Sequence, residues 1–205
     1  MHLHLRHLSK RFNRQWVIED LSDQFPPGSF TGIRGGNGSG KSTLLRMLAG
    51  QLTPSRGTIT HSLGGRTLPV GQIYAHVSWT GPYLEVVEEM TLLELLTFHF
   101  TFIPPAPAFT APLDVLRRIG LDAVRNRKLE DCSSGMRQRV LLATALYADT
   151  PLLLLDEPTL TLDEDSAAWF YAELERQRAG RTTVLASNDP RDLVACDRIL
   201  ALVPR

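Results

Sequence analysis

Alternating hydrophobic and polar residues predict β-structure in two stretches of the N-terminal half of the chain. The run His2-Leu3-His4-Leu5 has the period of two that sends alternate side chains to opposite faces of a strand. Several short runs of this kind lie within residues 1–30, with a turn predicted at Pro26-Pro27-Gly28. A second β-like region covers 57–79, and its last part, 74–79, predicts a strand.

After residue 90 the spacing of hydrophobic residues becomes helical. Four residues recur at i, i+3, i+4 and i+7, the spacing of one helix face: Leu92, Leu95, Leu96 and His99. They predict a helix over 91–102, which Pro104-Pro105-Ala106-Pro107 ends because proline breaks helices. Two shorter helices are predicted within 112–128 and a longer one over 134–148.

Strand and helix patterns alternate in the last third of the chain. The run Leu152-Leu153-Leu154-Leu155 is apolar without alternation, as expected of a parallel strand buried on both faces. Residues 182–187 and 198–203 predict two further strands with a short helix between them. This order predicts a parallel sheet with right-handed crossover connections.

Nine consecutive residues contain the eight-residue pattern G-x-x-x-x-G-K-[ST] and the threonine that follows it: Gly35, Gly36, Asn37, Gly38, Ser39, Gly40, Lys41, Ser42 and Thr43. The glycines let backbone N–H groups turn toward a phosphate, because no Cβ blocks a positive φ or a close approach. Lys41 would lie near the β- and γ-phosphates, and the Ser42 hydroxyl would hold Mg²⁺. A strand at 29–33 and a helix from about Lys41 supply the required context, so nucleotide binding is favoured over a plain glycine-rich turn.

Two carboxylates, Asp156 and Glu157, follow the leucine run. Ligands of open α/β sheets sit at the carboxyl ends of the strands, which is where both side chains would lie. Asp156 would then meet Mg²⁺ held by Ser42, and Glu157 could orient an attacking water. A solvated turn after the strand is the alternative, and the phosphate loop upstream favours the functional interpretation.

The composition narrows the possible partners. The 205 residues suffice for one domain, and 22 Lys plus Arg balance 22 Asp plus Glu, so no basic field attracts nucleic acid or anionic lipid. Two cysteines are too few for a disulfide scaffold. Neither a signal peptide nor an apolar run of membrane-spanning length is present. In a strand, His7 would point to the opposite face from His2 and His4, so we expect these three histidines to form no metal site.

In this order, the motifs resemble the ATP-binding cassette of ABC transporters, and the resemblance runs along essentially the whole chain. The segment Cys132-Ser133-Ser134-Gly135-Met136-Arg137-Gln138-Arg139 resembles the family's signature motif, L-S-G-G-Q followed by R-Q-R. Ser133 and Gly135 match it, whereas Ser134 and Met136 depart from it. An ordinary Ser-capped helix start is the alternative for this segment.

Two further segments carry the resemblance. Leu160-Thr161-Leu162-Asp163 resembles the D-loop, which brings Asp163 into the set of nucleotide-binding candidates. Phe12 resembles the aromatic residue that stacks on adenine, although a plain core aromatic is equally compatible with its pattern.

The resemblance implies an α/β fold: a P-loop NTPase core with a mainly parallel sheet, an N-terminal antiparallel β subdomain and a small inserted helical subdomain. All of it would form one domain, 1–205, with the helical part at about 84–148. ATP and Mg²⁺ are the implied ligands. Two cassettes, as a homodimer or a heterodimer with another cassette, would pair head to tail so that Ser133 and Gly135 meet the partner's γ-phosphate.

The same resemblance implies a separate transmembrane permease as partner and no nucleic acid. Nucleotide-driven closure and opening of the dimer would move that permease. The protein would then be cytoplasmic, held on the inner face of the membrane through the permease.

Two positions depart from the family pattern. Asn188 stands where the family has its switch histidine; it can donate to a γ-phosphate oxygen but carries no charge, or it could simply cap the short helix near Asp189-Pro190. The Q-loop glutamine is expected near 80–83, where the chain has Thr80-Gly81-Pro82-Tyr83. Its role would be lost or supplied by another group, such as Glu85 or water.

With Glu157 and Asn188 as the catalytic residues, we expect an ATPase with slow turnover. Two alternatives stay open: a degenerate cassette that binds ATP with little turnover, and a non-transport ATP switch.

Overall fold

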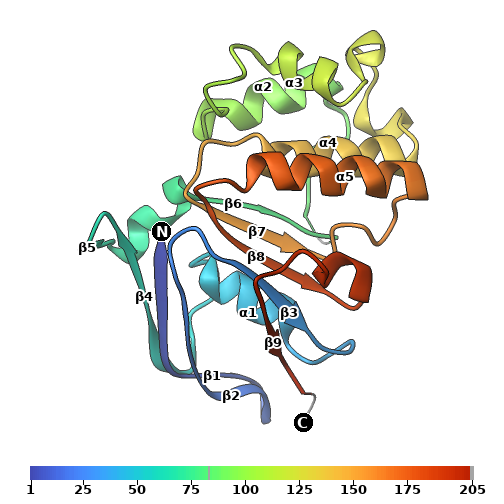
Figure 1. Ribbon diagram of the computed structural model, residues 1–205. Helices are drawn as coiled ribbons and strands as arrows, with labels where there is room; N and C mark the ends of the chain where they lie inside the picture. The colour runs from blue at the N-terminus through green and yellow to red at the C-terminus, as the bar shows by residue number, and fades with distance from the viewer. Residues whose placement is uncertain (83, 204–205) are drawn as a thin grey trace.

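The strands of the protein form two sheets, which Figure 1 shows in a computed structural model that describes residues 1–82 and 84–203. Tyr83, in the segment expected to hold the Q-loop, therefore lies outside the described residues. The antiparallel sheet has the order β2-β1-β4-β5: β1 (His2–Phe12), β2 (Gln15–Phe25), β4 (Arg56–Leu63) and β5 (Arg66–Thr67). The parallel sheet has the order β6-β7-β8-β3-β9: β3 (Phe30–Arg34), β6 (Val77–Thr80), β7 (Leu152–Asp156), β8 (Thr182–Ser187) and β9 (Arg198–Ala201).

Helices cover both faces of the parallel sheet (Figure 1). Helix α1 (Lys41–Leu48) lies between the two sheets, whereas α4 (Ser134–Leu146) and α5 (Glu164–Gln177) lie on the opposite face, with α2 (Leu92–Phe102) and α3 (Pro112–Arg118) outermost. Short 3₁₀ helices complete the connections: η1 (Val70–His76), η2 (Asp122–Val124), η3 (Leu129–Asp131) and η4 (Pro190–Leu193). None of the helices described is long and apolar enough to cross a membrane.

Strand β7 has no solvent-facing side, as its leucine run predicts. Leu152 and Leu154 pack into the core shared with α1 and the antiparallel sheet, whereas Leu153 and Leu155 pack into the core under the helices. All four leucines are 0% exposed. The fold therefore has two hydrophobic cores, one on each side of the parallel sheet.

The expectation of a strand over 74–79 is partly wrong. The chain forms the 3₁₀ helix η1 as far as His76, and only Val77–Thr80 pairs with β7. Within η1 only Ile73 is buried, while Val70 and Tyr74 are about three-quarters exposed. The alternation over 74–79 runs across the end of η1 into β6, so the pattern could not separate the last turn of the 3₁₀ helix from the start of the strand.

The N-terminal alternation is confirmed. His2 and His4 lie on one face of β1 with their rings stacked, and Leu3 and Leu5 point into the core on the other face. The short runs expected within 1–30 join into two long strands, because β-bulges near His7 shift the pairing register without ending the strands.

Helix α4 is fastened to the parallel sheet at its C-terminal end by Arg181. This guanidinium donates to the carbonyl oxygens of Leu146 (2.8 Å) and Ala145 (3.2 Å), the last turn of α4. It also donates to the Ser78 hydroxyl of β6 (2.7 Å) and to the Thr150 carbonyl (2.8 Å). Burial lowers the pKa of Arg181 to about 10, so the side chain stays charged and favours the negative end of the helix dipole.

Buried His61 fastens α1 to the antiparallel sheet in a comparable way. Its Nε2 lies 2.7 Å from the carbonyl oxygen of Leu48, the last residue of α1, and must carry a proton to donate to it. Burial is the larger influence on this imidazole and lowers its pKa. The folded protein therefore holds His61 neutral at a pH where the unfolded chain, with an ordinary pKa of about 6.5, begins to bind a proton.

We expect the free energy of unfolding to fall as the pH drops below about 6.5, with a contribution from His61. His61→Gln keeps an N–H donor for the Leu48 carbonyl but cannot titrate, so the variant should lose less stability between pH 7 and pH 5 than the parent. Chemical denaturation at both values measures this, with pH 8 as the baseline. Equal losses in the two proteins would show that His61 makes no contribution.

Candidate nucleotide-binding site

A cavity of about 480 Å³ opens at the carboxyl edge of the parallel sheet. Residues from β1, β2, the loop after β3, α1 and the ends of β6, β7 and β8 line it: Phe12, Val17, Gly36, Asn37, Gly38, Ser39, Gly40, Lys41, Ser42, Thr43, Pro82, Glu157, Leu160 and Asn188. The structure thus brings most of the predicted phosphate loop together with Phe12, Glu157 and Asn188.

The loop between β3 and α1 depends on glycine at the position that starts the helix. Gly40 is the N-cap of α1 with φ 96°, in the left-handed region, and a Cβ there would lie 2.9 Å from a Val17 methyl group. Gly38 also has a positive φ, of 78°. These conformations turn the loop around the start of α1, whose free N–H groups then face the cavity.

Lys41 is buried at the floor of the cavity, with 6% of its side chain exposed. Its Nζ donates to Asn188 Oδ1 (2.7 Å) and to the Gly35 carbonyl (2.8 Å), and it pairs with Glu157 Oε1 at 3.0 Å. Three oxygens from three segments therefore fix one ammonium group. A phosphate oxygen bound here would gain a charge-assisted hydrogen bond in a partly desolvated setting.

Glu157 is held at the edge of the sheet by contacts with β8. Its backbone N–H donates to the Ala186 carbonyl (2.8 Å), and its Oε2 accepts from the Asn188 N–H (3.0 Å) and lies 3.1 Å from the Ser187 hydroxyl oxygen, whose proton points to the nearer Asp192. The backbone φ of Glu157 is 45°, a left-handed conformation that non-glycine residues adopt at a cost. These hydrogen bonds supply the compensation that keeps the carboxylate in place.

Asn188 belongs to the site and does not cap the following helix. The cap of η4 is Asp189, whose carboxylate accepts from the Arg191 N–H (2.8 Å), so the capping alternative is wrong. The Asn188 amide oxygen accepts from Lys41, and its Nδ2 donates to Asn37 Oδ1 (2.5 Å). The side chain therefore bridges the end of β8 to the phosphate loop.

Asp156 and Ser42 fit a Mg²⁺ site. Asp156 is 1% exposed, and its Oδ1 has no hydrogen-bond partner among the described residues. Burial raises the pKa of this carboxyl, and a hydrogen bond from Ser42 opposes the rise. One carboxylate and one hydroxyl are enough for Mg²⁺ when phosphates and waters complete the octahedron. In the described parts of the chain no three His, Cys, Asp or Glu residues form a metal-binding group.

Phe12 is 46% exposed and lines the cavity, so the alternative of a plain core aromatic is wrong. The Lys10 ammonium lies 5.2 Å from the centre of the ring. Stacking of Phe12 on the base of a nucleotide stays a prediction.

The signature and D-loop residues lie apart from the cavity of their own chain. Ser133 is the exposed N-cap of α4 and accepts from the Met136 N–H (3.3 Å), and Asp163 caps α5 through the Ser166 N–H (2.8 Å). Neither these two residues nor Gly135 is among the described residues that line the cavity. Capping alone accounts for Ser133 and Asp163 at these two positions. Contact of Ser133, Gly135 or Asp163 with a nucleotide stays a prediction.

Glu85, which could supply the role of the missing Q-loop glutamine, lines a separate groove beside α2 and is not among the described residues that line the nucleotide cavity, so that role stays a prediction. Position 81, directly after β6, has no room for a side chain, since a Cβ on Gly81 would lie 2.9 Å from the Asp156 Cβ. The sequence interpretation missed Pro82 and Val17 as lining residues and Ser187 as a partner of Glu157. Ser187 could have been found, because it ends a parallel strand at the same edge.

Comparisons with known proteins agree with this geometry. A family model described as ABC transporter matches residues 18–160. The chain is 35% identical over 199 residues to the zinc import ATP-binding protein ZnuC of Cereibacter sphaeroides, covering 96% of this chain and 76% of the relative. It is 33% identical over 190 residues to the cytochrome c biogenesis ATP-binding export protein CcmA of Rhizobium etli, covering 91% and 87%.

The fold has solved counterparts. The dimeric structure of MJ0796, a bacterial ABC transporter cassette, matches with a TM-score of 0.85 and 22% identity, covering 98% of this chain and 94% of that one. The predicted α/β architecture of the P-loop NTPase type is therefore confirmed.

Replacing Lys41 with Ala should weaken MgATP binding by about 10- to 100-fold, the loss that corresponds to one charge-assisted hydrogen bond. Isothermal calorimetry measures it, with Arg46→Ala, an exposed cation of the same helix, as the matched control. Unchanged affinity in the Lys41 variant would contradict the assignment of this loop to phosphate binding.

Proposed function

The chain belongs to the ABC transporter family as an ATP-binding, ATP-hydrolysing subunit, and we propose that two cassettes sandwich MgATP and drive a separate membrane permease. The observation that carries this proposal is the convergence of Lys41, Glu157 and Asn188 on one cavity, with contacts of 3.0 Å or less. The alternative of a degenerate cassette without turnover is not favoured, because the carboxylate that would activate water is present and positioned.

In the proposed reaction, Glu157 orients and polarises the water that attacks the γ-phosphorus of ATP, and ADP leaves. Lys41 and the N–H groups at the start of α1 stabilise charge on the phosphoryl oxygens. Asn188 donates its amide hydrogens to the same group. Asp156 and Ser42 would hold Mg²⁺, which neutralises negative charge on the phosphate oxygens when bound.

A second cassette would give Ser133 and Gly135 their role, because both residues lie outside the cavity of their own chain. Ser133 is exposed, and a Cβ added at Gly135 would meet no atom within 4 Å, so the start of α4 is open to a partner. In a head-to-tail pair, these N–H groups and the positive end of the α4 dipole would complete the site of the other cassette. The partner is a second copy of this chain or another cassette.

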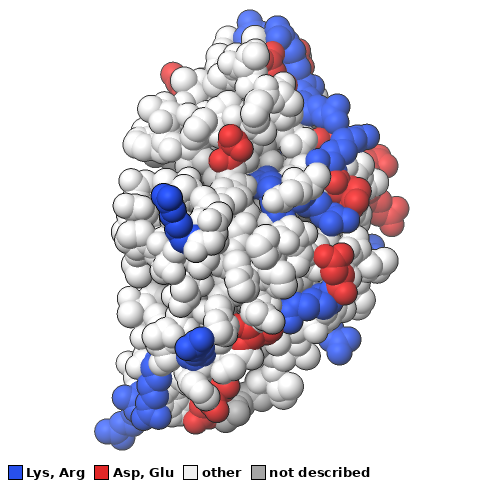
Figure 2. Space-filling model, turned by 60° about the vertical axis from the view of Figure 1, so that its left-hand side comes forward, with Lys and Arg blue, Asp and Glu red and all other residues white. Residues whose placement is uncertain are grey.

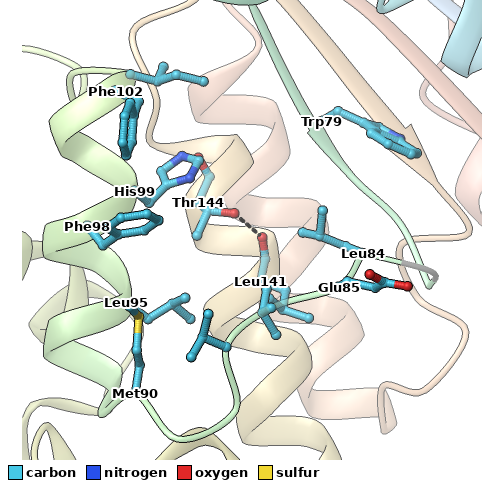
Figure 3. A pocket seen from close by; sticks show the side chains of 13 residues that line it. Trp79, Leu84, Glu85, Met90, Leu95, Phe98, His99, Phe102, Leu141 and Thr144 are labelled. Atoms are coloured by element: carbon cyan, nitrogen blue, oxygen red, sulfur yellow. Dashed lines mark hydrogen bonds between the residues drawn. The ribbon is translucent and has the colours of Figure 1, made fainter. Parts of the chain in front are cut away.

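The permease would dock in an apolar groove between α2 and α4. Figure 3 shows Leu95, Phe98, His99 and Phe102 of α2 facing Leu141 and Thr144 of α4, with Leu84 and Glu85 from the segment after β6. Phe98 is 52% and Phe102 is 67% exposed, an arrangement that favours an apolar partner segment. Pro82 lines the nucleotide cavity and Leu84 lines the groove, so residues only two positions apart in the chain belong to the two sites.

Few charged side chains interrupt the centre of the molecular face in Figure 2, and most of those visible gather along one margin. That view turns forward the side that carries β5 and α2 in Figure 1. We propose that the contact between the groove and the permease holds the protein on the inner, cytoplasmic face of the membrane. The solute and the direction of transport belong to the permease, and the relatives named above include both an import and an export protein.

Glu157→Gln keeps the size of the side chain but removes the charge that orients water, so turnover should fall by about 100-fold or more. MgATP should still bind, and the variant should accumulate as an ATP-bound dimer in size-exclusion chromatography. Glu175→Gln, an exposed carboxylate on α5, is the control. Hydrolysis by the Glu157 variant at the parent rate would make this assignment wrong.

Asn188→Ala should lower turnover by roughly tenfold or more, because one preorganised donor to the phosphoryl group is lost. Asn188→His should preserve or raise turnover, since a neutral imidazole can accept from Lys41 through one ring nitrogen and donate to the phosphoryl group through the other. Steady-state kinetics and thermal melting on both variants measure this. An Ala variant that melts earlier but turns over normally would show a structural role only.

A further inference from the structure

A second buried carboxylate lies behind the site, on the short helix η4. Asp192 is 2% exposed and accepts three hydroxyl hydrogen bonds. The donors are Ser187 at the end of β8 (2.6 Å), Thr159 in the loop after β7 (2.9 Å) and Tyr171 of α5 (2.7 Å). Burying a carboxylate costs free energy unless it is fully hydrogen-bonded, so these three hydroxyl groups are what allow Asp192 to be buried.

Two of these three donors lie directly beside the catalytic residues. The Ser187 hydroxyl is 3.1 Å from Glu157 Oε2, and the next residue, Asn188, donates its N–H to the same oxygen. Thr159 lies two positions after Glu157, which has the left-handed backbone conformation, so its hydrogen bond holds the chain directly after that residue. Asp192 thus joins the segment that follows Glu157 to the segment that ends in Asn188.

We propose that Asp192 is a positioning residue for ATP hydrolysis, which clamps the loop after β7 to the end of β8 and so fixes Glu157 and Asn188 relative to each other. The inference rests on the proposed role of Glu157. It assigns Asp192 no contact with the nucleotide, because Asp192 does not line the cavity. A strained backbone such as that of Glu157 persists only where its surroundings hold it, and Asp192 supplies that hold.

A carboxylate is required because three hydroxyl groups must all donate to it. Its two oxygens offer about four lone-pair sites, whereas an Asn side chain offers one oxygen and an NH₂ group that cannot accept. Asp192→Asn therefore keeps the shape and loses at least one of the three bonds. The freed segment can then shift Glu157, and a misplacement of about 1 Å can cost up to about 100-fold in rate.

The test measures turnover, MgATP affinity and melting temperature of Asp192→Asn. Turnover should fall by about tenfold or more while MgATP affinity stays within about twofold, because Lys41 keeps its other partners and Asp192 hydrogen-bonds to no described residue of the phosphate loop. Glu173→Gln is the matched control: Glu173 is also a 2% exposed carboxylate that accepts from a buried tyrosine hydroxyl, that of Tyr147 (2.9 Å), but it lies away from the cavity. This control should lower the melting temperature with turnover within about twofold of the parent.

Two further variants separate positioning from general destabilisation. Thr159→Val removes one hydroxyl at nearly constant volume and should lower turnover in the same direction, even if Asp192→Asn folds poorly. Asp192→Asn combined with Ser187→Ala should be no slower than the slower single variant, because both act through the same contact. Parent turnover in Asp192→Asn or in Thr159→Val, equal losses in affinity and turnover, or additive effects in the double variant would each overturn the proposal.

Glu157→Gln belongs in the same series of measurements. If that variant hydrolyses ATP at the parent rate, the proposed function of Glu157 fails, whatever Asp192→Asn does. If Glu157→Gln is inactive and Asp192→Asn is normal, only the positioning role of Asp192 fails.

Discussion

Burial of β7 on both faces is the constraint on which the site depends. Its four leucines fill two separate cores, so the strand can lie only inside the parallel sheet, between β6 and β8. That position delivers Asp156 and Glu157 to the carboxyl edge. Parallel pairing then brings the end of β8, with Ser187 and Asn188, to the same edge, and β3 beyond it leads into the phosphate loop. The register of β7, β8 and β3 therefore places the residues of the site next to one another.

The sequence predicted those elements whose structure is determined by residues close together in the chain. The glycine-rich loop, the leucine strand and the helix at Leu92–Phe102 all carry strong local patterns, and the structure contains them. The strand expected over 74–79 is wrong only for its first three residues, which complete η1, because the alternation runs across the boundary between η1 and β6. The contacts of Asn188 with Lys41 and Asn37 could not be predicted, since they join residues about 150 positions apart whose side chains meet only across the folded sheet.

Electrostatics of the site follow from the same assembly. One buried cation, Lys41, lies beside Glu157, while Asp156 is buried next to them with a carboxyl oxygen that lacks a partner among the described residues. Ionised carboxylates in such surroundings are costly, because burial removes their hydration. The surplus of negative charge beside Ser42 matches what a divalent cation neutralises. The buried Asp192 adds a third carboxylate that is satisfied by hydroxyl groups instead.

The anchoring of α4 by Arg181 has a mechanical consequence. The guanidinium ties the last turn of the helix to β6 and to the segment before β7, whereas Ser133, at the other end, is exposed. If this C-terminal end is taken as the fulcrum, Ser133 lies at the end of the longest arm of α4. Its 13 residues span about 20 Å, so a rotation of about 10° at the fulcrum would carry Ser133 through about 3 Å, the length of a hydrogen bond. A small tilt at one end is thus enough to make or break a hydrogen bond of Ser133 at the other.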